Sequence, residues 1–177
     1  MSMTLNPVNE AAFQKAVQSL ETLNRAAVFH PTGTGKSCIA WKVVEAHPQT
    51  TFFWLVAGAQ RLALRQAELT RYNGGTLPGN VRFCDCEKLA AATPEQWVRL
   101  GEQKPGCIVL DCYHELSAVC WAQSVQKLLR MCPQAKVLGL GVPNGAPVCA
   151  AAQELFADCI VSHMTVAEAM AAGTMPV

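Results

Sequence analysis

The feature that most constrains this chain is a glycine-bearing loop, HPTGTGKS, which spans residues 30–37 between an apolar run and a helical pattern. Gly33 and Gly35 would let the backbone turn sharply and bring its N–H groups against an anion. The helix expected after the loop would point its positive N-terminal end at the same anion. In loops of this kind, the lysine reaches the β- and γ-phosphates of a nucleotide and the hydroxyl binds Mg²⁺.

The loop therefore predicts a binding site for a nucleoside triphosphate, most simply ATP with Mg²⁺. Lys36 is the expected catalytic contact to the phosphates, and Ser37 is an expected magnesium ligand. The predicted nucleotide-binding residues are Pro31, Thr32, Gly33, Thr34, Gly35, Lys36 and Ser37. The alternative is a glycine-rich turn with a surface lysine, since G-x-G-K-[ST] alone arises by chance in roughly one in a hundred chains of this length. The strand–loop–helix context argues against that alternative.

The pattern along the whole chain predicts the fold class. Its 177 residues fit one ordinary domain, spanning 1–177. Apolar runs typical of strands alternate with helical patterns, and we expect the strands at 26–29, 51–56, 81–84, 107–110 and 137–140. Helices are expected at about 9–23, 37–46, 60–69, after Thr93, at 116–131 and after Thr165. This alternation predicts an α/β domain with a central, mostly parallel sheet.

The composition of the chain excludes several classes of protein and disfavours some kinds of binding partner. With 51% hydrophobic and 15% charged residues, the chain should form a compact globule. A net charge of +1 argues against a protein that anchors nucleic acid mainly by charge. Nine cysteines without a C-x-x-C pair indicate reduced thiols rather than disulfides or a zinc site. We expect no membrane association and a cytoplasmic location, because no signal pattern or spanning apolar run occurs.

The motifs also resemble a known family. P-T-G-T-G-K-S after a short strand resembles motif I of the superfamily 2 (DEAD/DEAH-box) helicases. Residues 110–114, LDCYH, are similar to the D-E-x-H box of motif II, and residues 137–143, VLGLGVP, to the strand that leads into motif III. Residues 57–66 occupy the place of motif Ia. The chain is similar to bacterial proteins of this family over about 9–175, and the matching pieces are 41–48, 73–83 and 135–140.

The resemblance implies a fold and a parent activity. The fold would be a RecA-like P-loop NTPase domain, a three-layer sandwich that forms the first, ATP-binding motor domain of a helicase. The second helicase domain would be absent from the chain. Asp111, at the motif II aspartate, would be a catalytic residue and a Mg²⁺ ligand. The implied partners are ATP, DNA or RNA, and a second motor domain or partner chain.

Departures from the family pattern bear on catalysis. Cys112 stands where the family has the glutamate that activates water, and such a general base typically supplies ~10²–10⁴-fold in rate. Glu115 is an alternative base. The hydroxyls of motif III are missing from residues 141–143. The family's arginine finger comes from the second domain and would increase the catalytic rate by roughly 10³–10⁵-fold. His30 replaces the usual first glycine of the loop. We expect weak ATP hydrolysis and no duplex unwinding by the chain alone.

Several residues allow two interpretations. Arg61 and Arg65, four positions apart, could contact a nucleic-acid backbone, but a solvated helix face is the preferred interpretation. Asn9 and Phe13 fall where the family contacts adenine, and Phe13 equally completes an apolar helix stripe. His114 either couples the nucleotide to a second domain or is an ordinary loop histidine.

Three hypotheses for the function remain open. The first is a helicase-type motor domain that acts with a second domain or a partner chain. The second is a catalytically inactive, nucleotide-gated interaction module. The third is a small P-loop kinase, which we disfavour because the sequence shows neither an arginine-rich lid nor an acceptor-site motif.

Overall fold

The computed structural model describes residues 3–112, 119–143 and 154–175. Six parallel strands form one sheet in the order β3-β2-β4-β5-β1-β6. The strands are β1 (Arg25–Phe29), β2 (Phe52–Val56), β3 (Val81–Asp85), β4 (Cys107–Asp111), β5 (Lys136–Gly141) and β6 (Ile160–His163). The helices are α1 (Pro7–Leu23), α2 (Lys36–Ala46), α3 (Ala59–Tyr72), α4 (Cys86–Ala90), α5 (Pro94–Glu102), α7 (Val119–Met131) and α9 (Val166–Ala171), with a 3-10 turn η1 (Ala157–Cys159).

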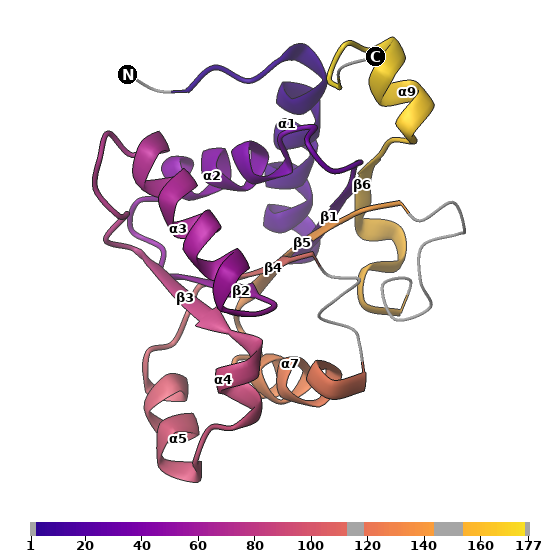
Figure 1. The fold of residues 1–177 in the computed structure, drawn as a ribbon. Coiled ribbons are helices and arrows are strands. Elements are labelled where there is room, and N and C mark those ends of the chain that lie inside the picture. Colours follow the sequence, from indigo (N-terminus) through magenta and orange to yellow (C-terminus); the bar gives the residue numbers. More distant parts are fainter. Residues whose placement is uncertain (1–2, 113–118, 144–153, 176–177) are drawn as a thin grey trace.

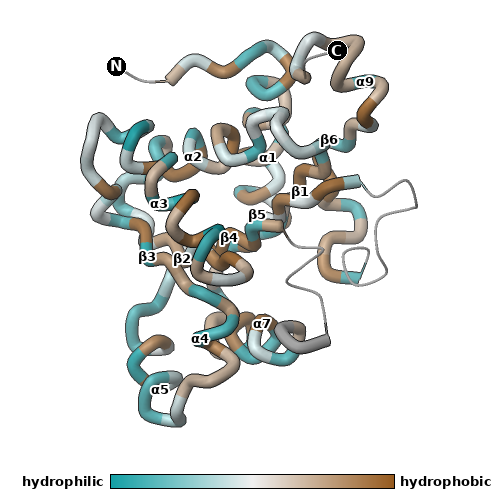
Figure 2. Tube along the Cα trace, viewed as in Figure 1, coloured by the Kyte–Doolittle hydropathy of each residue, from teal (hydrophilic) through white to brown (hydrophobic). Residues whose placement is uncertain are grey.

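Helices cover both faces of the sheet (Figure 1). Successive strand residues point to opposite faces, so Phe52 and Trp54 pack with α1, α2 and α3, whereas Phe53 and Leu55 pack against α4, α5 and α7. Every residue of β2 and β4 is buried, which explains why these strands read as continuous apolar runs. Figure 2 shows this apolar character along the central strands. The predicted three-layer α/β arrangement is confirmed.

The predicted elements agree closely with the observed ones. Each of the five expected strands is present, and no strand end differs from the expected one by more than one residue. The expected capping boxes are also confirmed, because Thr93 pairs with Gln96 and Thr165 with Glu168. The first helix begins at Pro7, earlier than expected, because the Asn6 side chain accepts from the N–H of Asn9 and caps it.

Strand β6, helix α4 and the turn η1 were not predicted from the sequence. Strand β6 is an edge strand whose residues are only half-buried or exposed, so it lacks a strong apolar run. Helix α4 has five residues and starts directly from β3, where Asp85 caps it. The expected start of the helix at 116 lies outside the described residues.

The parallel arrangement brings the candidate residues to one edge of the sheet. The loop after β1 and the end of β4 both lie at the carboxyl edge, separated by β5 alone. Ligands of open parallel sheets bind outside this edge. Within the described ranges, none of the helices is both long and apolar enough to cross a membrane. Among the described residues, the buried cysteines Cys84, Cys107 and Cys132 form no disulfide.

Candidate nucleotide-binding site

The glycine-bearing loop links β1 to α2 as predicted. Gly33 and Gly35 have φ of +86° and +87°, a conformation that glycine adopts without strain. A Cβ on Gly35 would lie 2.9 Å from Nδ2 of Asn9 in α1. The same Nδ2 donates to the carbonyl oxygen of Thr34 at 2.8 Å. Asn9 therefore braces the loop from beneath, and only glycine fits at position 35.

Hydrogen bonds within the loop hold its curled shape. Thr34 Oγ1 donates to the carbonyl oxygen of Pro31 at 2.8 Å. Lys36 Nζ donates to the carbonyl oxygens of His30 and Pro31 at 2.7 and 2.8 Å. Burial lowers the pKa of Lys36 to about 8, although Cys112 and Asp111 act in the opposite direction. The ammonium group thus remains charged at neutral pH and lies inside the curl where an anion would bind.

His30 connects this loop to the edge strand. Its side chain is fully buried, and Nε2 lies 2.7 Å from Ser162 Oγ in β6. Burial lowers the pKa of His30 to about 4, reinforced by the neighbouring Lys36 and His163, so the imidazole is neutral. The residue that departs from the family pattern therefore anchors the loop. Sequence reasoning missed this role because β6 was not predicted.

Asp111 ends β4 and is only 4% exposed. Its Oδ2 accepts from Arg65 Nε at 2.5 Å and from Trp54 Nε1 at 3.0 Å. Arg65 also pairs through Nη1 with Glu68, one turn further along α3. The expectation of a solvated helix face is therefore wrong for Arg65. Helical spacing on one element cannot reveal a partner on a different strand.

Cys112 follows Asp111 and is half-buried, with φ of +60°. Arg61 Nη1 donates to its Sγ at 3.1 Å. Arg61 is exposed, as the preferred interpretation expected, yet it is directed to the end of β4. Both arginines of the segment that resembles motif Ia thus contact the segment that resembles motif II. Two other candidate residues, His114 and Glu115, lie outside the described residues.

A cavity of about 570 Å³ opens between the loop and α3. Thr32, Gly33, Gly35, Lys36 and Ser37 line one side of it. Residues at the end of β4 and on α3 line the rest: Asp111, Cys112, Arg61, Arg65, Glu68 and Tyr72, together with Cys38 and Val142. The structure thus brings most of the predicted site residues together. Pro31 and Thr34, which are buried, shape the loop from within.

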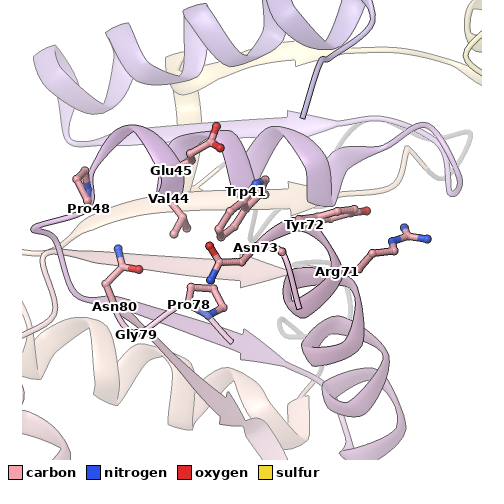
Figure 3. A pocket seen from close by; sticks show the side chains of 11 residues that line it. Trp41, Val44, Glu45, Pro48, Arg71, Tyr72, Asn73, Pro78, Gly79 and Asn80 are labelled. Carbon is pink, nitrogen blue, oxygen red and sulfur yellow. The ribbon is translucent and has the colours of Figure 1, made fainter. Parts of the chain in front are cut away.

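Figure 3 shows a second cavity, which has a volume of about 500 Å³. It is bounded by the C-terminal half of α2, the end of α3 and the turn-rich segment at 73–80. Tyr72 lines both cavities, and Cys38 Sγ lies 3.4 Å from its hydroxyl oxygen. Tyr72 therefore forms a shared wall between the two spaces.

The residues at the loop suit a polyphosphate. The first N–H groups of a helix have no intrahelical partner, and those of α2 begin at Lys36, next to the cavity. The residues suit magnesium less well. Ser37 lines the cavity, but the carboxylate of Asp111 already accepts from a guanidinium and an indole.

The two residues expected near adenine, Asn9 and Phe13, make contacts within the protein. Asn9 is buried and bonded to the loop backbone, and Phe13 packs against the cluster between α1, α2 and the sheet. The interpretation of Phe13 as part of an apolar stripe is consistent with this packing.

Comparison with known proteins bears on the fold. No family model and no curated protein matches the sequence. The chain is similar to the crystal structure of a hypothetical ATP-dependent RNA helicase from Sulfolobus tokodaii, with a TM-score of 0.64 and 11% identity. It is also similar to a Sulfolobus solfataricus SWI2/SNF2 ATPase core in complex with dsDNA, with a TM-score of 0.59 and 13% identity.

The matches cover 92% and 90% of this chain. They cover 52% of the first solved chain and 36% of the second, so this chain spans about half and about a third of their lengths. At such low sequence identity, the similarity shows the fold alone. The chain has the RecA-like α/β fold found in the core domains of helicases and SNF2-type ATPases.

Proposed function

We propose that this chain is a helicase-like ATP-binding domain that holds the triphosphate in the loop at residues 30–37. One observation carries the proposal. Helix α2 begins with Lys36 and Ser37, directly after the cap residue Gly35, and these three residues line a cavity of about 570 Å³. Asp111 lines the same cavity. A polyphosphate would replace the loop carbonyl oxygens as the partner of Lys36. The similarity to ATP-dependent motor proteins favours ATP as the ligand.

The family resemblance also implies a magnesium ion at this site. Ser37 and Asp111 are the groups that would hold it, and it would neutralise phosphate charge when bound. Asp111 would first have to exchange its contact with Arg65.

Hydrolysis by this site is expected to be weak. Cys112 presents a thiol where the family has a carboxylate base, and Arg61 contacts its sulfur. These contacts favour the second candidate function, a nucleotide-gated interaction module without turnover. A DNA or RNA partner is a proposal supported by the solved neighbours, one a hypothetical ATP-dependent RNA helicase and the other an ATPase core in complex with dsDNA. A second motor domain or partner chain stays a proposal from the family resemblance. The cytoplasmic location stays a prediction.

Thermal unfolding with and without ATP tests the proposal. ATP at about a hundred times its dissociation constant should stabilise the fold by about 2.7 kcal/mol, a shift of several degrees. Lys36→Ala should abolish the shift, because Lys36 is the loop's ammonium group. Lys15→Ala, which removes an exposed lysine of α1, is the matched control and should retain it. An equal shift in Lys36→Ala and the wild type would place ATP elsewhere and refute the proposal.

A further inference from the structure

Asp111, the residue expected to hold magnesium, already has a cationic partner. Arg65 Nε lies 2.5 Å from its Oδ2, and the Trp54 indole donates to the same oxygen at 3.0 Å. Asp111 and Trp54 are buried, so this cluster is part of the protein interior rather than a surface pairing. Glu68 holds the other side of the Arg65 guanidinium. The carboxylate is thus neutralised and oriented by α3.

A magnesium ion would have to compete with this arrangement. Mg²⁺ demands near-ideal octahedral oxygen ligands at close range and takes one or two carboxylates beside the substrate phosphates. A guanidinium fixed on the same carboxylate repels a dication. One of the two carboxylate oxygens, Oδ2, already accepts two hydrogen bonds. Among the described residues no group of three or more His, Cys, Asp or Glu side chains offers an alternative metal site.

The same guanidinium is suited to the phosphates themselves. Arg65 lines the cavity together with Lys36 and Arg61, so three cationic side chains border the space next to the glycine loop. Guanidinium groups bind phosphate oxygens through paired, charge-assisted hydrogen bonds. The cavity is also lined by Asp111 and Glu68, but the three cations outnumber these two carboxylates, so an anion would meet a net positive charge without a metal ion.

We propose that Arg65 takes the place of magnesium, so that this site binds nucleoside triphosphate as the metal-free anion. The inference rests on the proposed function and specifies which form of ATP the site prefers. Arg65 acts as the counter-cation that in a metal-dependent site the ion would supply, and it remains paired with Asp111 while it faces the phosphates.

Isothermal titration of ATP into the full chain, once with excess MgCl₂ and once with EDTA, tests the inference. For the wild type, the dissociation constant of ATP in EDTA should exceed that in magnesium by no more than about threefold. Arg65→Gln should weaken binding in EDTA about tenfold or more, as expected for the loss of a charge-assisted contact. Magnesium should restore most of that loss, because Asp111 becomes available to it.

Arg71→Ala is the matched control, since Arg71 lies exposed on the same helix and does not line this cavity. It should bind ATP like the wild type under both conditions. Wild-type binding that weakens tenfold in EDTA would overturn the inference while leaving ATP binding intact. Absence of ATP binding under both conditions would instead defeat the proposed function and the inference with it. The wild-type comparison is decisive even where Arg65→Gln does not fold.

Discussion

At the scale of single residues, the least expected feature is the imidazole at the start of the glycine-bearing loop. His30 fills a fully buried position between β1 and β6 and meets Ser162 through Nε2. Its Nδ1 has no hydrogen-bond partner within the described part of the chain. A buried neutral imidazole of this kind makes the loop's anchor sensitive to acid, because protonation would place a charge next to Lys36.

This anchor predicts a pH dependence of stability. The pKa of His30 falls from 6.5 to about 4 on folding, so the unfolded chain binds the proton more tightly than the folded one. Its contribution is complete above about pH 6.5 and is lost progressively as the pH falls toward 4. The expected loss is about 2 kcal/mol between about pH 7.5 and 5. Urea unfolding at both pH values measures it.

His30→Gln should remove most of this pH-dependent loss, because glutamine cannot be protonated. His163→Gln, which changes an exposed histidine of β6, should leave most of it in place. Equal losses in the wild type and His30→Gln would show that other groups dominate the acid sensitivity.

At the scale of elements, β5 shows how a strand is fitted to its neighbours. It lies between β1 and β4 and contains Gly139 and Gly141. A Cβ on Gly139 would lie 2.4 Å from the Phe156 ring, and one on Gly141 would lie 2.2 Å from the Phe29 ring. The glycines therefore make room for two aromatic rings that belong to the core cluster beneath α7.

We expect Gly139→Ala to destabilise the protein by about 1–3 kcal/mol, because the added methyl group overpacks the ring of Phe156. The free energy of unfolding in urea gives the value directly. Gly79→Ala is the control, since a Cβ there meets nothing within 4 Å. A change in Gly139→Ala no larger than in the control would mean that Phe156 moves aside without cost.

The helices and strands differ in how well they could be predicted from the sequence. Strands β2 and β4 were predictable because both faces are covered and their residues are uniformly apolar. The loop at 30–37 was predictable because its chemistry is local. Strand β6 was not, since a half-buried edge strand carries a weak pattern. The contact of Arg65 with Asp111 joins α3 to the end of β4, and no periodicity within α3 indicates it.

At the scale of the whole molecule, the order of strands sets which groups can cooperate. The glycine loop follows β1 and Asp111 ends β4, with β5 between them, so both reach one cavity at the carboxyl edge of the sheet. Helix α3 closes that cavity with two arginines and Glu68. The fold thus brings together the residues proposed to bind a nucleotide, while Cys112 and the pairing of Arg65 affect the residues expected to take part in its cleavage.

This distribution predicts the response of the chain to nucleic acid. The chain should bind ATP, yet single- or double-stranded DNA and RNA should not stimulate phosphate release from ATP, because Cys112 is no general base and Arg65 holds Asp111. Phosphate release in the presence of magnesium measures this, with Lys36→Ala as the background. A stimulation of about tenfold that disappears in Lys36→Ala would identify a working motor domain and exclude the interaction module. Unchanged release beside intact ATP binding would leave nucleotide-gated interaction as the function of this RecA-like domain.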